Sequence, residues 1–341
     1  MTAKSTLKEQ CQRILEDNGG KVADKTNRIL LEDLALTNLT KPLKFISQNW
    51  RDPLTPAMMS LSCEAVGGQA STTHEASLAM SLMNLSFYIW DDLIDKARFK
   101  QFKPTLVGKF GEGASIMIGG LATAKAFSIL NQMEIRRTKN QTITKLFWNL
   151  WTQMAKAETA NLQLRDQQNS SSRKKMWIIK TEAAAYLQTC LKIGAILGNG
   201  SRNETKHLGE YGLNLGIILE LWKDLHVSFN LTLELAEKIR SGALPYSLMW
   251  AREHSEKIPK KLEKLEKKKT IEPSEIREIV QDALQTKALN NSLKIIRELT
   301  KKAKDSIANL KTINKSTQTL QFFVEAQPQL VSESLQSLQN Y

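Results

Sequence analysis

Apolar residues recur every three or four positions along nearly all of the 341-residue chain, and no segment alternates polar and apolar residues as a strand would. Helix-breaking residues are few, with 16 glycines and 8 prolines, so most of the helical segments can run uninterrupted. No internal repeat or low-complexity linker divides the sequence. The pattern therefore predicts an all-α bundle of many helices, formed by residues 1–341 as a single domain.

The clearest helix boundaries flank the segment 55–95. Thr55-Pro56 predicts a helix start, with Thr as the cap and Pro at the first helical position, and Gly67-Gly68 predicts the end of that helix. Residues 73–95 are apolar on almost every side, which is typical of a central buried helix. Further apolar helices are predicted at about residues 113–131, 142–164, 176–197 and 208–229.

The chain carries a strong positive charge. Lys and Arg number 48 against 35 Asp and Glu, a formal net charge of +13, which favours an anionic lipid or a phosphorylated small molecule as partner. Residues 256–341 are the most charged and are expected to form amphipathic helices around the core. The lysine run 257–269 has interleaved Glu, so a solvated helix face explains it. No nucleic-acid-binding motif accompanies the charge, and no nucleic-acid partner is expected.

Three scattered cysteines, Cys11, Cys63 and Cys190, are too few for a disulfide framework or a zinc knuckle. The first 20 residues mix charges throughout and contain no apolar signal core. No apolar stretch is expected to reach the roughly 18–20 residues of a membrane span, because Lys125 interrupts the most apolar one. These features predict a soluble cytoplasmic protein without a transmembrane segment.

Acids are concentrated in the segment FYIWDDLIDK, residues 87–96. On a helix Asp91 and Asp95 lie one turn apart on the same face, and Asp92 lies about 100° around the helix. Carboxylates this close raise each other's pKa unless a cation lies among them, and Mg²⁺ held by carboxylates and substrate phosphates is the usual solution. A solvated helix end is the simpler explanation for a bare DDxxD pattern.

Aromatic residues change that balance, because Phe87, Tyr88 and Trp90 directly precede the acids. A helix that passes from apolar residues to clustered acids suits the wall of a pocket with a metal-binding mouth. Core packing remains the simpler explanation for any one of the three aromatic side chains.

Residues 91–130 resemble the first aspartate-rich region of the trans-polyprenyl (isoprenyl diphosphate) synthases. Pro104-Thr105, Lys109-Phe110-Gly111 and Ala126-Phe127 fall in register with that region without a gap. Further matches follow in the family's order at residues 64–68, 180–181, 211–225 and 238–245. The resemblance covers about residues 50–250. It implies the isoprenoid synthase fold, a multi-helix bundle around a central cavity with acid clusters facing each other across its mouth.

The resemblance further implies an enzyme of isoprenoid biosynthesis in which several Mg²⁺ ions bridge carboxylates and a substrate diphosphate. The candidate catalytic and metal-binding residues are Asp91, Asp92 and Asp95, with Asp224 and Glu220 as further metal ligands. The candidate substrate-binding residues are Lys100, Lys180, Lys238, Phe87, Trp90 and Trp222.

Two departures from the family concern the second substrate, isopentenyl diphosphate. Chain-elongating members bind diphosphate with a GGKRxRP segment, whereas residues 50–56 read WRDPLTP and place Asp52 where the family has Lys. Arg51 is one residue away and could partly substitute. Asn84 and Trp90 stand where the family has His. Because Asp repels a phosphate that Lys would attract, the usual site for isopentenyl diphosphate is expected to be lost.

The second aspartate-rich region is also altered. Where the family has DDxxD, this chain has Lys223, Asp224 and Val227, with Glu220 in place of the usual Gln. Asp224 and Glu220 are one helical turn apart and could form a reduced metal site. Alternatively, Lys223 contacts the diphosphate directly, or Asp224 remains in an ion pair with Lys223 or a nearby Arg.

Together these features favour an enzyme that ionises an allylic prenyl diphosphate. It would then cyclise or eliminate, as a terpene synthase does, or transfer the prenyl group to an acceptor other than isopentenyl diphosphate. A chain-elongating synthase with a rewired isopentenyl site is one alternative, and a non-catalytic partner subunit of a related synthase is another. Because members of the family pair as homodimers or heterodimers, a dimer is expected.

Overall fold

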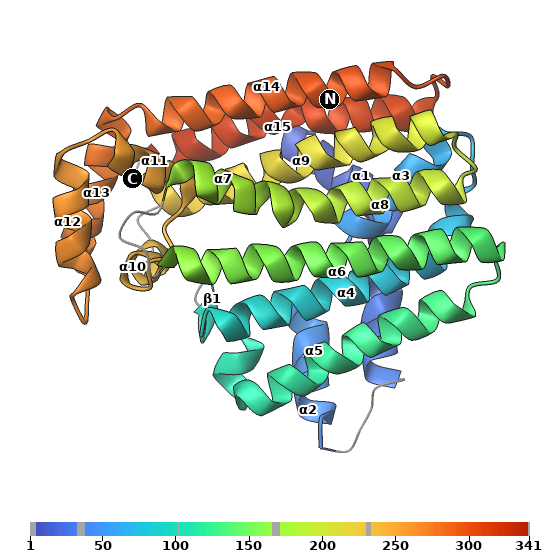
Figure 1. The fold of residues 1–341 in the computed structure, drawn as a ribbon, viewed down its shortest axis with the longest axis horizontal. Helices are drawn as coiled ribbons and strands as arrows, with labels where there is room; N and C mark the ends of the chain where they lie inside the picture. Colours follow the sequence, from blue (N-terminus) through green and yellow to red (C-terminus); the bar gives the residue numbers. More distant parts are fainter. Residues whose placement is uncertain (1–4, 33–37, 101–102, 166–170, 230–232, 340–341) are drawn as a thin grey trace. The chain divides into compact units, whose positions relative to one another are not determined.

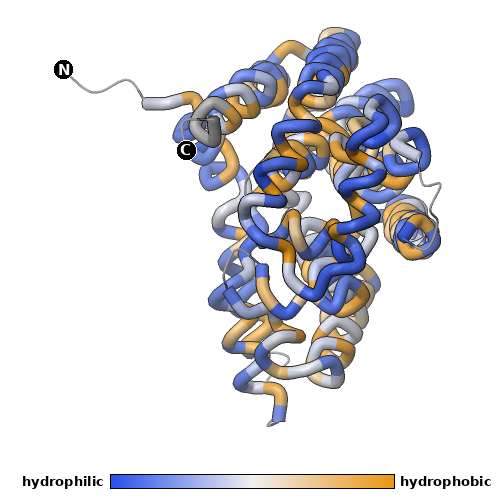
Figure 2. The backbone as a smooth tube through the Cα atoms, turned by 90° about the vertical axis from the view of Figure 1, so that its left-hand side faces the viewer, coloured by the Kyte–Doolittle hydropathy of each residue, from blue (hydrophilic) through white to orange (hydrophobic). Residues whose placement is uncertain are grey.

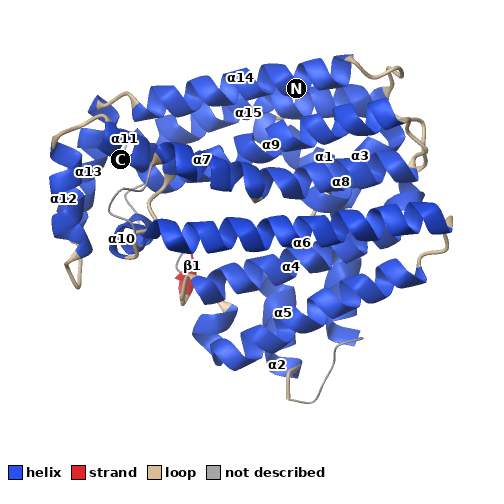
Figure 3. Ribbon diagram, viewed as in Figure 1, coloured by secondary structure: helices blue, strands red, loops and turns tan. Residues whose placement is uncertain are grey.

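The computed structural model of the chain describes residues 5–32, 38–100, 103–165, 171–229 and 233–339. Almost all of these residues are helical (Figure 3), which confirms the all-α prediction. Within these ranges the only strands are β1 (Phe99–Lys100) and β2 (Lys103–Pro104), which pair antiparallel. They form a minimal hairpin between two long helices rather than a layer of the fold.

Contacts between Cα atoms divide the chain into two compact units, each assembled from segments that are distant in sequence. Unit 1 comprises residues 1–148, 189–209 and 310–320, and unit 2 comprises residues 149–188, 210–309 and 321–341. Four helices contribute residues to both units: α6 (Arg137–Arg165), α8 (Ala183–Leu197), α9 (Arg202–Phe229) and α15 (Lys315–Gln339). The single domain expected from the sequence stays a prediction.

The remaining helices, many of which are labelled in Figure 1, belong to one unit each. Those of unit 1 are α1 (Leu7–Glu32), α2 (Thr40–Asn49), α3 (Leu54–Ala65), the 3₁₀ helix η1 (Ala70–Thr73), α4 (His74–Ile94) and α5 (Leu106–Gln132). Those of unit 2 are α7 (Ser172–Thr181), α10 (Leu233–Arg240), α11 (Tyr246–Glu253), α12 (Lys257–Glu266), α13 (Pro273–Gln285) and α14 (Ala288–Ala308).

Helices α4 and α5 lie side by side in unit 1 (Figure 1). Most of α4 is buried, as predicted for residues 73–95. The close approach of the two helices depends on Gly119 of α5, because a Cβ atom there would lie 2.5 Å from Nε1 of Trp90. The hydroxyl of Ser86 on α4 donates a hydrogen bond of 2.9 Å to the Gly119 carbonyl. The acid-bearing end of α4 is therefore fixed by direct contact with the α5 backbone.

The start of α3 differs from the sequence prediction. The helix begins at Leu54 with Pro53 at the N-cap position, and Asp52 rather than Thr55 supplies the side chain that accepts hydrogen bonds at its start. The Asp52 carboxylate accepts hydrogen bonds from the Thr55 backbone N–H at 3.1 Å and from its hydroxyl at 2.5 Å. The predicted end is confirmed, because α3 stops at Ala65 and Gly67 follows with a φ of 87°. Glycine adopts this left-handed conformation without the steric cost that a Cβ atom imposes.

Two other boundaries differ from the predictions. The helix expected at residues 176–197 is two helices, because the backbone of Glu182, at φ −93° and ψ −83°, separates α7 from α8. Helix α5 begins at Leu106, earlier than expected, with the Thr105 hydroxyl accepting from the Gly108 N–H. Gly111, at φ 81°, then kinks α5 near the position where the sequence suggested a start.

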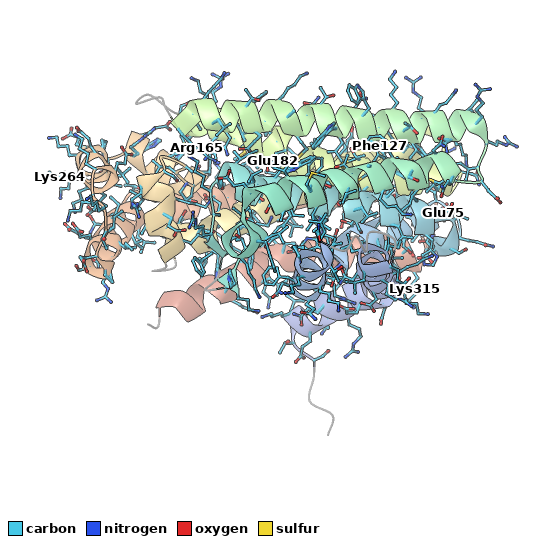
Figure 4. The ribbon with its side chains drawn as sticks, turned by 90° about the horizontal axis from the view of Figure 1, so that it is seen from below. Glu75, Phe127, Arg165, Glu182, Lys264 and Lys315 are labelled. Carbon is cyan, nitrogen blue, oxygen red and sulfur yellow. The ribbon has the colours of Figure 1, made fainter. Side chains whose placement is uncertain are left out.

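Helices α12 to α14 of unit 2 are amphipathic, as the charge pattern predicted. Figure 2, coloured by hydropathy, shows hydrophilic and hydrophobic residues interspersed along the helices of the molecule in general. Helix α12 buries three apolar residues on one face, Ile258, Leu262 and Leu265. Its lysines include the exposed Lys264, labelled in Figure 4, and Lys261, whose ammonium lies 2.5 Å from both Glu278 and Asp282 of α13. Lysines of the run therefore face solvent, and one of them, Lys261, joins α12 to α13 by ion pairs.

Helix α5 contains a longer apolar stretch than the sequence predicted. By length and composition alone it could cross a membrane, a property that core helices of other proteins share. Only 33% of its most apolar window is buried. Ile116 and Met117 of this helix are 51% and 55% exposed. Part of α5 thus packs against α4, and part presents apolar side chains outward.

Gly194 of α8 supplies a test of packing in unit 1. A Cβ at this position would lie 2.3 Å from the Met59 carbonyl oxygen, so we expect Gly194→Ala to lower the free energy of unfolding by about 1–3 kcal/mol. Lys25→Ala is the control, because Lys25 is an exposed residue of α1 in the same unit and such surface substitutions change stability by about 0.5 kcal/mol or less. Denaturant unfolding of both variants measures the difference; equal stabilities would contradict the predicted close approach.

Candidate functional site

The three acids of the sequence motif lie at the C-terminal end of α4, in unit 1. Asp91 has a half-exposed side chain at 42%, whereas the Asp92 carboxylate is fully buried at 0%. Asp95 is the C-cap, and its N–H donates to the Asp91 carbonyl. The helix ends here because Lys96 adopts a left-handed φ of 52° and the Ala97 N–H turns back to the Asp92 carbonyl. The turn leads the chain directly into β1.

Strand β1 places the ammonium of Lys100 between the two adjacent acids. Lys100 Nζ lies 2.9 Å from Oδ2 of Asp91 and 2.5 Å from Oδ1 of Asp92. The same ammonium lies 5.1 Å from the ring centroid of Tyr88, on the preceding turn of α4. Lys100 thus contacts two carboxylates and an aromatic face from one position.

The charges of this cluster depend on one another. Burial raises the pKa of Asp92 to about 6, although Lys100 acts in the opposite direction. Burial lowers the pKa of Lys100, but the charges of Asp91 and Asp92 outweigh it and hold that pKa above its usual range. The Asp92 carboxylate makes a close ionic contact with Lys100 at 2.5 Å. Lys100 is therefore the group that keeps a buried carboxylate charged.

The acids are chemically suited to a hard divalent cation, since carboxylate oxygens are the ligands that Mg²⁺ prefers. In the arrangement described, no three acid, His or Cys side chains of the described residues converge on one point. Asp91, Asp92 and Asp95, all at this end of α4, are the residues that would hold an ion. Bound there, Mg²⁺ would act as a Lewis acid and a template for a diphosphate.

Asp224 of α9, in unit 2, makes contacts that the sequence did not reveal, and its role as a metal ligand stays a prediction. Its buried carboxylate accepts hydrogen bonds from the Tyr246 N–H, from the Ser247 N–H at 3.0 Å and from the Ser247 hydroxyl. Asp224 therefore caps the N-terminus of α11 from a neighbouring helix. The positive end of the α11 dipole also stabilises its negative charge. The ion pair with Lys223 left open by the sequence is not formed. Burial raises the Asp224 pKa against these hydrogen bonds.

The other candidates of unit 2 lie on three helices. Glu220 pairs with Lys223 at 3.2 Å on the surface of α9. Trp222 stacks on His226, with ring centroids 5.6 Å apart and planes 4° apart, a contact that the sequence analysis missed although the residues are one turn apart. Lys180 is exposed in the last turn of α7, and Lys238 is half-buried in the last turn of α10.

Two aromatic candidates of unit 1 lie on α4. Phe87 is buried, and Trp90 is half-buried with its indole against Gly119 of α5. For Trp90 this contact supports the packing interpretation that sequence reasoning preferred for any single aromatic. Because these acids and aromatics belong to unit 1 while Asp224 belongs to unit 2, the predicted facing of the two acid regions stays a prediction.

Residues 50–56, which stand in place of the family's basic diphosphate-binding motif, bond to other parts of this chain. Asn84 of α4 donates a hydrogen bond of 2.9 Å to the Asp52 carboxylate, so the two residues that replace the family's Lys and His contact each other. Arg51 makes a bidentate pair with Glu16 at 2.6 and 2.9 Å and a further bond of 2.9 Å to Asp24, both on α1. The sequence analysis missed these partners of Arg51.

The helix order and the acid-bearing end of α4 define a fold class, that of the isoprenyl synthases. The geranylgeranyl pyrophosphate synthetase of Pyrococcus horikoshii superposes with a TM-score of 0.82 at 20% identity, over 94% of this chain and 98% of that one. A polyprenyl synthase of Caulobacter crescentus gives 0.82 at 17% identity, over 96% and 99% of the two chains.

The chain belongs to the polyprenyl synthetase family, whose sequence profile matches residues 37–283. This finding confirms the resemblance inferred from the motifs. The chain is also 25% identical over 176 residues to the geranylgeranyl diphosphate synthase of Sulfolobus acidocaldarius. That match covers 50% of this chain and 53% of the relative, so the chain spans about half the length of the relative it matches.

The capping role of Asp224 can be tested without metal or substrate. We expect Asp224→Ala to lower the free energy of unfolding by about 1–3 kcal/mol in buffer containing a chelator, because three buried donors lose their acceptor. Denaturant unfolding followed by circular dichroism measures the change. Glu220→Ala, on the same helix, removes a surface ion pair and is expected to cost less than about 1 kcal/mol. A residue that only binds metal would leave the metal-free stability unchanged.

Proposed function

We propose that this chain is a Mg²⁺-dependent prenyltransferase that extends an allylic prenyl diphosphate, a chain-elongating prenyl diphosphate synthase with a rebuilt isopentenyl site. Membership of the polyprenyl synthetase family supports the reaction class. The names of curated relatives, which are geranylgeranyl diphosphate synthases, support elongation over cyclisation. The observation that carries the proposal is the intact acid cluster at the end of α4. We also propose a cytoplasmic location.

In this proposal Asp91, Asp92 and Asp95 hold the metal that binds the substrate diphosphate. The half-exposed Asp91 is the first point of contact, and the buried Asp92 provides a carboxylate shielded from water, where charge interactions are strong. Lys180 and Lys238 are proposed to bind the departing diphosphate as point charges. Trp222, stacked on His226, is proposed to line the prenyl chain with an apolar face.

A second candidate has a specific observation in its favour. The side chains of Asp52, Asn84 and Thr55 hydrogen-bond to one another, and Arg51 is paired with two acids of α1. Arg51 is the one cation of residues 50–56, so this segment has no cation left to bind a second diphosphate. This arrangement favours an enzyme that ionises one allylic diphosphate and then cyclises, eliminates or prenylates an uncharged acceptor.

Product analysis separates the two functions. With Mg²⁺ and a C10, C15 or C20 allylic diphosphate, the proposed synthase forms longer prenyl diphosphates only when isopentenyl diphosphate is added. The second candidate releases pyrophosphate without isopentenyl diphosphate. Asp91→Ala is expected to reduce either activity by at least about 100-fold, because the metal loses a ligand. No turnover of any of the three substrates under either condition would contradict both.

We further propose that the chain forms a homodimer through the outward face of α5. Ile116 and Met117 on this helix and Trp148 on α6, all in unit 1, are each more than half exposed. Gly113 and Gly120 flank the two α5 residues on the same face and have open space in place of a Cβ, which would let a second helix approach closely. Burial of such large apolar side chains against a second copy removes them from water.

If the chain is a dimer, light scattering is expected to give a mass of twice the 38.5 kDa of the single chain. Replacing Ile116 and Met117 together by Glu is expected to give monomers, since two charges cannot be buried without partners. Ile313→Glu is the matched control, because Ile313 is 85% exposed in the same unit and lies outside this face. A wild-type monomer, or a double variant that remains dimeric, would contradict the interface.

A further inference from the structure

The loop before α15, in unit 1, exposes an apolar side chain at its tip. Ile313 is 85% exposed, more than any other large apolar side chain of the described residues. The loop is nevertheless held on both sides of the tip, because Leu310 is buried and the Asn314 side chain donates to the Glu64 carbonyl at 2.7 Å. The Asn314 side-chain oxygen also accepts from the Thr317 N–H at 3.0 Å. Ile313 is therefore presented to solvent by a loop that hydrogen bonds fix in place.

Two further connections of unit 1 lie beside this loop, around the end of α3 (Figure 1). The turn from α8 to α9 packs on α3, since a Cβ on Gly198 would lie 2.5 Å from the Cys63 carbonyl oxygen. The first turn of α6 reaches the same place, because Lys139 Nζ donates to the Asn199 side chain at 2.6 Å. Together these segments form one surface, the basic end, made of residues 134–139, 199–206 and 310–316.

The basic end carries an excess of positive charge. It contains seven Lys and Arg against two Glu, and residues 64–75, from the end of α3 to the start of α4, add two more Glu. Lys311 and Lys315 flank Ile313 in the sequence, and both are exposed. Lys315 opens α15, where the helix dipole disfavours a cation, so its charge does not serve the stability of its own helix.

Two of the acids at this end are already engaged by hydrogen bonds. The Ser316 hydroxyl donates to Glu64 at 2.8 Å, and the Ser201 hydroxyl donates to Glu204 at 2.6 Å. The bonds from Ser201 hold the pKa of Glu204 below its usual range, and the charge of Lys311 acts in the same direction. Lys311 therefore lies near the start of α9, and the loop and that turn present their cations together.

The combination of charge and an apolar tip indicates the kind of partner. A single exposed apolar side chain is ordinary by itself. Set among cations, it matches the surface of an anionic bilayer, where basic side chains meet the headgroups and an apolar one enters the interface. A bilayer accepts a protruding loop without a matching pocket, which a protein partner would have to supply.

We propose that the basic end docks on the surface of an anionic lipid bilayer, with Ile313 entering the headgroup region and Lys311 and Lys315 contacting lipid phosphates. The acid cluster lies at the far end of α4, whose 21 residues span about 30 Å from the α3 side. The docking surface is therefore separate from the candidate metal site, and the inference does not rest on the proposed function.

The test is co-sedimentation of the full-length chain with vesicles, without Mg²⁺ or substrate. The wild type is expected to bind vesicles of equal parts phosphatidylglycerol and phosphatidylcholine at least about tenfold more tightly than vesicles of phosphatidylcholine alone. Salt at about 1 M is expected to remove most of this preference, because it screens exposed charges. Replacing Lys311 and Lys315 together by Ser is expected to weaken binding to the anionic vesicles at least about tenfold.

The matched control replaces Lys260 and Lys264 together by Ser. Both are exposed lysines of α12, so the net charge changes equally, and the affinity is expected to stay within about threefold of the wild type. Ile313→Ser keeps every charge and is expected to weaken binding about fivefold or more, because the apolar contact is lost. Circular dichroism checks folding, which substitutions at exposed positions change little.

A polarity-sensitive thiol label on Ile313→Cys locates the tip. The native Cys11, Cys63 and Cys190 are buried, so the label is expected to react at position 313. Its emission is expected to move to shorter wavelength with anionic vesicles, whereas the same label on Lys260→Cys is expected to show no shift. Equal affinity for the two kinds of vesicle, or no binding to either, overturns the inference. So does an equal loss of affinity in the two double-lysine variants, wild-type binding by Ile313→Ser, or an unshifted label at 313.

Discussion

Two adjacent carboxylates at the end of a buried helix cannot both keep their charge unless a cation joins them. In this chain Asp91 and Asp92 create that demand, and Lys100 meets it. The surrounding structure serves the same arrangement, because α5 approaches closely enough at Gly119 to fix the end of α4, and the left-handed Lys96 turns the chain towards β1. The local geometry of unit 1 is thus organised around a compensated pair of acids.

The same principle recurs at two other positions. Asp52 is satisfied by Thr55 and Asn84, and Asp224 is satisfied by the N-terminus of α11. In each case a buried carboxylate has found donors within the chain, which is the ordinary requirement for burying a charge. In this member of the polyprenyl synthetase family, two buried carboxylates are thus satisfied by hydrogen-bond donors, and the third, that of Asp92, by the ammonium of Lys100.

The fold class and the family could be predicted from the sequence, because helical periodicity and the order of short motifs survive substitution at most positions. The site was only partly predictable. Motif alignment located the acids and Lys100, but it could not show that Asp52 and Asn84 contact each other across 32 residues. Nor could it show that Asp224 caps α11, because a carboxylate that binds metal and one that caps a helix look alike in a sequence. Such roles depend on long-range contacts that local spacing does not encode.

The contact between Trp90 and Gly119 restricts which residues these two positions can hold together. An indole on α4 fits only where the facing residue of α5 has no side chain, since a Cβ at position 119 would lie 2.5 Å from Nε1. The two positions are thus coupled. A residue larger than glycine at position 119 requires either a smaller residue at position 90 or a shift of the Trp90 ring.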